Sequence, residues 1–184
     1  MNITFIDSII FPVMSSIKKY LKSAKASIEA NDPESTLDFA NDALEEDPNC
    51  YFAYVFKGKA YQLLRDIPKA IKAFQKATEI EPNNLLAWKG YFQVLKVSDD
   101  YKLFFQVLTN LVRLLTDQGI SIAETLKDMR NYLDRQKYKS NDNLYEFYLR
   151  SILPGSELGD LIGTAIEPTD VTVKKLLDFK TSQT

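Results

Sequence analysis

Small residues and prolines recur along the first hundred residues with a spacing of 34. Three pairs show this spacing: Ala24 and Gly58, Ala43 and Ala77, and Pro48 and Pro82. Each proline should end a helix, because it lacks an amide hydrogen and disfavours the helical conformation in the residue before it. Asn49 and Asn83 are then expected to cap the helices that follow. The pattern predicts repeated helical hairpins.

The period that begins at Tyr51 is the most regular. Its marker positions are Gly58 at 8, Tyr61 at 11, Ala70 at 20, Phe74 at 24, Ala77 at 27 and Pro82 at 32. Small residues let paired helices approach, and the aromatic rings fill the gaps between them. This arrangement resembles the tetratricopeptide repeat, which implies an all-α fold, a right-handed α-α superhelix or solenoid.

The neighbouring periods are less complete. The first, from Ile17, carries Thr36 and Ala40 where alanine and a large aromatic residue are usual, as expected of a terminal copy. The third, from Leu85, keeps Trp88 at position 4, where it should belong to the hairpin core, and then departs from the pattern. We therefore predict a repeat domain over 15–97, composed of repeats 17–50 and 51–84 and a partial repeat 85–97.

Residues 98–153 are predicted to form an irregular helical extension without the 34-residue register. Their apolar face is Leu103, Val107, Leu111 and Leu115. A capping box from Ser121 to Glu124 should open a helix that runs to about Gln136. A further helix is expected from Asn141-Asp142-Asn143 to Leu153-Pro154-Gly155, and 154–184 should hold short helices and a frayed tail.

Residues 1–14 are predicted to be an N-terminal extension. No Lys or Arg precedes Ile9-Ile10-Phe11, which argues against a signal peptide, and no apolar stretch elsewhere reaches the roughly 20 residues of a membrane span. One hypothesis is that translation starts at Met14 rather than Met1, with Ser15 and Ser16 capping the first helix. In the alternative, Ile9, Phe11 and Val13 dock on the first hairpin.

Charge and cysteine content limit which partners and which cellular compartment can be expected. The chain has 23 basic and 25 acidic side chains and a net charge of -2, so no whole-molecule field attracts nucleic acid or membrane. The single cysteine, Cys50, cannot form an internal disulfide, which favours a reducing compartment. We predict a cytoplasmic protein, with the nucleus as the alternative.

Candidate residues for catalysis are lacking. The chain contains no histidine, which removes the usual general base, triads and metal ligand, and it has no phosphate-binding glycine loop. The carboxylate runs Glu45-Glu46-Asp47 and Glu79-Ile80-Glu81 fall at repeat ends, where solvated surface is the expected role. We predict no enzyme activity, no cofactor, no metal and no small-molecule substrate.

A partner-binding site can be placed by the tetratricopeptide resemblance, which implies that positions 2, 5, 9 and 12 of each first helix line a concave groove. In the first repeat these positions are Lys18, Leu21, Lys25 and Ile28. In the second they are Phe52, Val55, Lys59 and Gln62, and in the third they are Leu86, Lys89, Gln93 and Lys96. Five of them are lysines. The groove is then either a basic site for an acidic peptide or phosphate backbone, with Phe52 and Leu86 as anchors, or an ordinary solvated face. Direct RNA binding should be weak at most and steeply salt-dependent.

The five-residue clamp by which tetratricopeptide co-chaperones hold the carboxylate end of heat-shock chaperones is not matched. The corresponding positions are Leu21, Lys25, Phe56, Leu86 and Gly90, and none carries the clamp's residue type. We therefore do not expect chaperone-tail binding through such a clamp.

Three stretches carry a narrower resemblance: Asn49-Cys50-Tyr51-Phe52-Ala53, Asn83-Asn84-Leu85-Leu86-Ala87-Trp88-Lys89-Gly90 and Leu153-Pro154-Gly155-Ser156. From near Met14 onward the chain resembles the N-terminal arm of the superkiller (Ski) complex scaffold. The resemblance implies a non-catalytic subunit of a cytoplasmic assembly in which an RNA helicase and WD-repeat subunits feed messenger RNA to the exosome for 3′ to 5′ decay. The N-terminal arm is implied to act on the exosome side.

The family scaffold is far longer than 184 residues, so the chain is a fragment, a truncated relative or a separate short protein. The alternative function is a stand-alone adaptor that binds another peptide and has no part in RNA decay.

Overall fold

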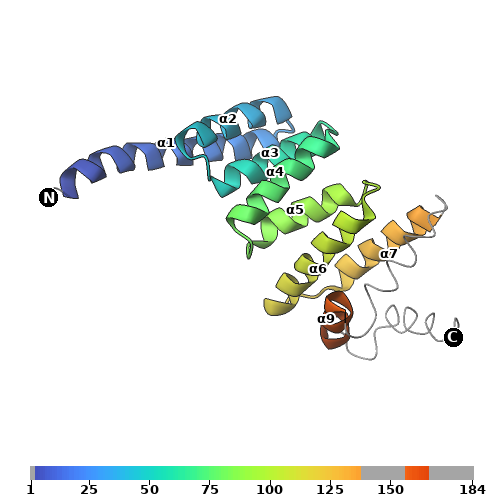
Figure 1. The fold of residues 1–184 in the computed structure, drawn as a ribbon. Coiled ribbons are helices and arrows are strands. Elements are labelled where there is room, and N and C mark those ends of the chain that lie inside the picture. Colours follow the sequence, from blue (N-terminus) through green and yellow to red (C-terminus); the bar gives the residue numbers. More distant parts are fainter. Residues whose placement is uncertain (1–2, 138–155, 166–184) are drawn as a thin grey trace, which may run out of the picture. The chain divides into compact units, whose positions relative to one another are not determined.

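The computed structural model describes residues 3–137 and 156–165, and all its regular elements there are helices (Figure 1). They are α1 (Ile3–Glu29), α2 (Pro33–Glu46), α3 (Tyr51–Leu63), α4 (Ile67–Ile80), α5 (Leu85–Leu95), α6 (Tyr101–Asp117), α7 (Ala123–Lys137) and α9 (Glu157–Ala165). The predicted all-α class is confirmed. The helix expected between residues 141 and 153 lies outside the described residues.

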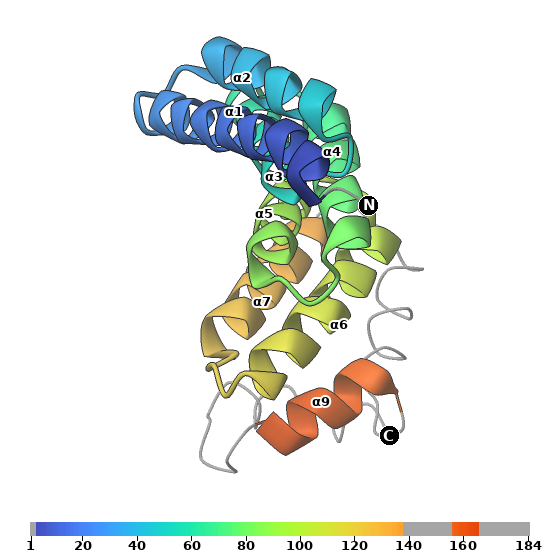
Figure 2. The ribbon, with the colours of Figure 1, turned by 90° about the vertical axis from the view of Figure 1, so that its left-hand side faces the viewer.

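The chain divides into two compact units, Met1–Ser98 and Asp99–Thr184. In the first unit α1 pairs with α2 and α3 pairs with α4, while α5 packs against both α3 and α4 (Figure 2). The first helices of the successive repeats, α1, α3 and α5, also contact one another in order. None of the described helices has the length and apolar character needed to cross a membrane.

The start of each second helix follows the 34-residue spacing. Asp32, Asp66 and Asp100 cap α2, α4 and α6, and each carboxylate accepts a hydrogen bond from the backbone amide three residues later, at 3.1, 3.2 and 3.0 Å. In two of the turns a residue with positive φ comes just before the cap, Asn31 at 57° and Arg65 at 59°. We predicted that the 34-residue spacing ends at Val97. This prediction is wrong for the helix boundaries, because α6 starts 34 residues after α4.

The predicted caps of the first helices are also wrong. The N-cap of α5 is Asn84, whose side-chain oxygen accepts from the amide of Leu86 at 3.1 Å, and the N-cap of α3 is Cys50, without a side-chain cap. Asn49 instead donates its amide to the Asp47 carboxylate at 2.9 Å. The turn after each proline is one residue longer than the sequence interpretation assumed.

The N-terminal extension is part of α1, which begins at Ile3 and is much longer than α2 (Figure 1). Ser15 and Ser16 lie inside this helix, so they do not cap it when the residues before Met14 are present. The side chains of Ile9, Phe11 and Val13 lie outside the described set, and the start of translation at Met14 stays a prediction.

The first hairpin has a core of small residues. Ala40, Ala43 and Ala53 are fully buried beside Cys50, and half-buried apolar side chains, among them Phe56 of α3, pack around this cluster. Thr36 is buried where alanine is usual, and its hydroxyl donates to the Asp32 carbonyl at 2.7 Å. That hydrogen bond replaces the one to water that the hydroxyl loses when it is buried.

The second hairpin has an aromatic core in which Phe74 of α4 is fully buried. A Cβ atom built on Gly58 of α3 would lie 2.8 Å from the Phe74 ring, and one on Gly90 of α5 would lie 2.3 Å from it. The ring therefore occupies the space that these two glycines leave open on neighbouring helices. The packing roles predicted for Gly58 and Phe74 are confirmed, whereas the role of Gly90 was not predicted.

Tyr51 links the first turns of α3 and α5. Its hydroxyl accepts a hydrogen bond from the backbone amide of Ala87 at 3.0 Å, and both residues are buried. Ala87 is the third residue of α5, where the helix itself offers no acceptor for the amide. Burial raises the pKa of Tyr51 to about 12.

Replacing Tyr51 with phenylalanine should lower the free energy of unfolding by about 1–3 kcal/mol, because the Ala87 amide would stay buried without an acceptor. Urea denaturation followed by the fluorescence of Trp88, the single tryptophan, would measure this change in the first unit. Tyr54→Phe is a matched control on the same helix, since its hydroxyl donates to Pro48 at an exposed site where water can replace it. Equal losses for both variants would contradict the role assigned to Tyr51.

Alkaline pH should lower the stability of the first unit, because ionisation would place a negative charge on the buried Tyr51 phenol. The folded pKa of about 12 lies above the usual value near 10, so folding favours the neutral phenol. The stabilisation by Tyr51 is complete below about pH 10 and is lost as the pH rises from there through about 12. Over that interval the wild type should lose more stability than Tyr51→Phe in denaturant titrations. Parallel losses would show that Tyr51 does not titrate in this way.

The second unit is built on α6, whose buried face includes the predicted Val107, Leu111 and Leu115. Phe104 of α6 stacks on the fully buried Tyr132 of α7, with ring centroids 3.8 Å apart. Helix α9 packs on α6, and its Leu158 is buried. At the start of α7 the Ser121 hydroxyl accepts a hydrogen bond from the backbone amide of Ala123 at 3.4 Å. In the predicted capping box the donor would be the next amide, that of Glu124.

Candidate partner-binding surface

Charge is separated between α1 and α2, the two helices of the first hairpin. Helices α3 and α5 contain no acidic residue, and from Met14 onward α1 has only Glu29. In contrast, α2 has no basic residue and five acidic ones, Glu34, Asp38, Asp42, Glu45 and Glu46. The layer formed by α1, α3 and α5 is therefore basic, as expected for an acidic partner, although α4 is basic as well, with three lysines and one acidic residue, Glu79.

The position-2 residues of all three first helices reach solvent. Lys18 is exposed on α1, and the side chains of Phe52 on α3 and Leu86 on α5 are 44% and 37% exposed. Contiguous exposed apolar patches mark binding surfaces, and Phe52 and Leu86 lie near the beginnings of two helices that contact each other. The structure is therefore compatible with the predicted anchor role of Phe52 and Leu86.

Position 5 differs between the three helices. Lys89 is exposed and Leu21 is half-buried, but Val55 is fully buried, so its predicted place in the groove is wrong. The reason is that α3 is an inner helix, which contacts α1, α2, α4 and α5 and has little free surface left. Val55 belongs to the core.

The remaining positions keep contact with solvent. Lys25 and Gln93 are exposed, and the half-buried residues are Ile28, Lys59, Gln62 and Lys96. Lys25 lies 3.8 Å from Glu29, but both side chains are 68% exposed, and such a pair contributes little stability. Among the described residues neither Lys59 nor Lys89 forms an ion pair, so both ammonium groups are available to a partner.

Three exposed apolar residues were not predicted from the sequence. Leu63 is the last residue of α3 and is 44% exposed, Leu64 follows it and is 40% exposed, and Val97, just after α5, is 63% exposed. Leu63 and Val97 both occupy position 13. A residue 11 positions after position 2 returns to within about 20° of it on a helix, so position 13 could have been assigned to the same face.

Three of the five positions that correspond to the chaperone clamp take part in packing. Leu21 and Phe56 are half-buried against the small-residue core of the first hairpin, and Gly90 contacts Phe74. Only Lys25 offers a cation at the five positions.

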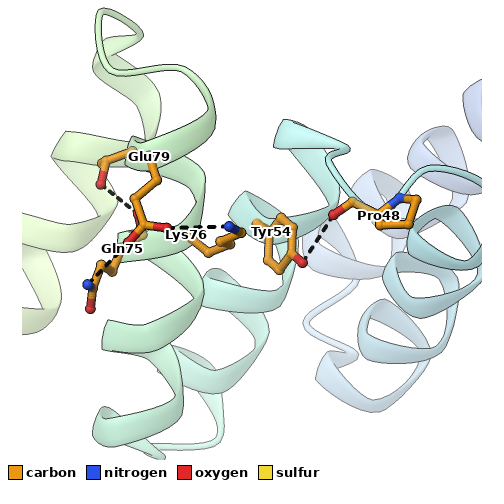
Figure 3. A network of polar contacts seen from close by, with 6 residues as sticks. Pro48, Tyr54, Gln75, Lys76 and Glu79 are labelled. Carbon is orange, nitrogen blue, oxygen red and sulfur yellow. Dashed lines mark hydrogen bonds and ion pairs between the residues drawn. The ribbon is translucent and has the colours of Figure 1, made fainter.

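Two aromatic side chains fix the first helices to the turns before them. The Tyr54 hydroxyl donates to the carbonyl of Pro48 at 3.2 Å (Figure 3), and the Trp88 indole donates to the carbonyl of Pro82 at 2.7 Å. Both aromatic residues are at position 4, and both prolines are at position 32 of the preceding repeat. Trp88 is half-buried and stacks on Tyr91, in keeping with its predicted place in the hairpin core.

The exposed polar groups of α4 interact among themselves. Glu79 accepts from Gln75 at 3.3 Å and pairs with Lys76 at 3.4 Å (Figure 3). No group of three or more residues able to hold a metal ion occurs within the described ranges. Cys50 is a buried free thiol, and desolvation by burial raises its pKa.

Comparison with known proteins agrees with this architecture. The tetratricopeptide repeat family matches residues 51–84, the period identified as most regular. In solved structures, the TPR2B domain of yeast Sti1 in its pHsp70 complex has a TM-score of 0.61 and 16% identity, covering 66% of this chain and 98% of that domain. The Sgt2 TPR domain from Aspergillus fumigatus has a TM-score of 0.55 and 20% identity, covering 75% and 84%.

Among curated proteins, the chain is 28% identical to superkiller protein 3 of Saccharomyces cerevisiae over 92% of this chain and 13% of that protein. It is 32% identical to the superkiller complex protein 3 of Homo sapiens over 66% of this chain and 8% of that protein. The predicted resemblance is therefore confirmed, although the chain spans only a small part of these relatives. The protein is an all-α tetratricopeptide-repeat chain whose sequence is similar to superkiller protein 3 along most of its own length.

Proposed function

We propose that the chain is a non-catalytic scaffold of the superkiller type, a component or short relative of that complex that assists exosome-mediated 3′ to 5′ decay of cytoplasmic messenger RNA. The observation that carries the proposal is the similarity to superkiller protein 3 over 92% of the chain. Tetratricopeptide repeats act by binding other proteins. The proposed partners are the helicase and WD-repeat subunits and the exosome.

The proposed contact surface is the face of α1, α3 and α5 that carries the exposed groove residues, without Val55. Its helices are fixed by the Tyr51 bond to α5 and by the Phe74 ring between α3 and α5. A surface that is already ordered loses little conformational entropy when a partner binds. Lys25, Lys59 and Lys89 add positive charge that attracts an acidic partner.

Affinity purification of the tagged chain from its native cells, with RNase treatment, tests the proposal. We expect to recover helicase, WD-repeat and exosome subunits. If a folded chain recovers none of them, it is a stand-alone adaptor instead.

The triple variant Lys25→Glu, Lys59→Glu and Lys89→Glu should lose these partners because the surface charge is reversed. A matched control with the same charge change is Lys72→Glu, Lys102→Glu and Lys127→Glu, all exposed residues of α4, α6 and α7. The control should retain its partners. Equal recovery with both triple variants would show that the basic face is not the contact surface.

A further inference from the structure

Two exposed apolar pairs lie at the two ends of α3 and α5. Phe52 and Leu86 are near the beginnings of these helices, and Leu63 and Val97 are at or just beyond their ends. All four side chains are between 37% and 63% exposed. Each pair on one helix is 11 positions apart in sequence, and for Phe52 and Leu63 within α3 this is about 16 Å along the axis and nearly a whole number of turns, whereas Val97 lies two residues beyond the end of α5.

The two helices are held in one register. Tyr51 at the start of α3 bonds to Ala87 at the start of α5, and both helices leave room for the same Phe74 ring through Gly58 and Gly90. The beginnings of α3 and α5 therefore lie together. Phe52 and Leu86 are therefore at one end of these neighbouring helices, and Leu63 and Val97 are at the other end, along what we call the α3–α5 seam.

Between the apolar pairs the surface is basic. Lys59 follows Phe52 by two turns on α3, and Lys89 follows Leu86 by one turn on α5. Neither helix contains a carboxylate, and the nearby acidic residues have partners of their own. Asp66 lies 2.9 Å from the Lys69 ammonium, and Glu81 accepts from Asn84 at 2.8 Å.

We propose that this seam binds an acidic amphipathic helix of a partner protein, with apolar side chains at i and i+11 and carboxylates at i+4 and i+7. This pattern places all four side chains on one face of the partner and matches the order apolar, basic, apolar of the seam. In an extended segment, residues on one face are about 13 or 20 Å apart at four or six residues, which matches about 16 Å less closely. The inference rests on the proposed protein-binding function and names the kind of partner.

Synthetic peptides can test the pattern directly against the full chain by fluorescence anisotropy. The probe is an alanine-based peptide with leucine at i and i+11 and glutamate at i+4 and i+7. One control moves the second leucine to i+9, on the opposite face, and another replaces both glutamates with glutamine. A third carries a central proline that breaks the helix, and a single-stranded oligouridine represents RNA.

The patterned peptide should bind about tenfold more tightly than each peptide control, a difference of about 1.4 kcal/mol. Lys59→Glu with Lys89→Glu should weaken its binding about tenfold and reduce its salt dependence, while Lys72→Glu with Lys127→Glu changes it less than about twofold. Phe52→Ser and Val97→Ser should each weaken binding as well, with the Trp88 fluorescence of the free protein reporting that it stays folded.

Equal binding of the leucine-shifted or proline-containing peptide would overturn the inference, as would RNA binding with the same lysine dependence and no peptide binding. If peptides fail but helicase and exosome subunits still co-purify, the inference is wrong and the proposed function stands. If the patterned peptide binds and no decay subunit co-purifies, the inference stands and the superkiller assignment is wrong.

Discussion

Replacing Phe74 with alanine is expected to lower the free energy of unfolding of the first unit by about 3–5 kcal/mol. The ring is fully buried and contacts both Gly58 and Gly90, so its loss leaves a cavity between α3, α4 and α5. The glycines have no side chains that could move into the space. Typical domains have only about 5–15 kcal/mol of stability, so the variant should be close to unfolding.

Urea denaturation followed by Trp88 fluorescence measures this effect, because Trp88 lies on α5 beside the affected packing. Phe52→Ala is the matched control, since its side chain is 44% exposed and its removal should cost well under half as much. A Phe74→Ala variant as stable as Phe52→Ala would show that the ring does not join the helices.

Adding a methyl group at Gly90 is the second large change. Gly90→Ala is expected to lower the free energy of unfolding by about 1–3 kcal/mol, because the new Cβ would lie 2.3 Å from the Phe74 ring. This is the opposite of the roughly 1 kcal/mol gain that alanine brings in an ordinary helix interior. The ring has little room to retreat, since Gly58 of α3 also contacts it.

A double-mutant cycle separates this contact from other causes. Combining Gly90→Ala with Phe74→Leu removes the ring that the methyl group meets, so the two losses should be clearly less than additive. Gly58→Ala should cost less than Gly90→Ala, because its Cβ would be 2.8 Å from the ring. Strictly additive losses in the cycle would contradict the assigned contact.

The repeats could be predicted from sequence because their packing residues have distinctive sizes. Gly58, Phe74 and Pro82 stand at the expected places in the central repeat, and the structure gives the first two the expected packing. In the third repeat the size pattern is lost, with Phe92 at position 8 and Phe104 at position 20. The register nevertheless persists in the cap Asp100, which local hydrogen bonding fixes independently of packing.

The candidate surface was less predictable, because exposure depends on which helices are neighbours. Lys18, Phe52 and Leu86 occupy the same repeat position and are all exposed. Val55 has the same position as the exposed Lys89, but α3 is covered on more sides. Leu63 and Val97 were missed because the conventional groove positions end at 12, one residue too early.

The sharing of Phe74 among three helices means that the repeat in the sequence and the unit of packing have different boundaries. A fragment cut at Asn84, where the sequence period ends, would remove Gly90 and the whole of α5 from one side of the ring. It would also remove the amide to which Tyr51 bonds. The smallest transplantable module that contains the central repeat therefore extends through α5, and chimaeras joined at the period boundary would separate residues that pack as one body.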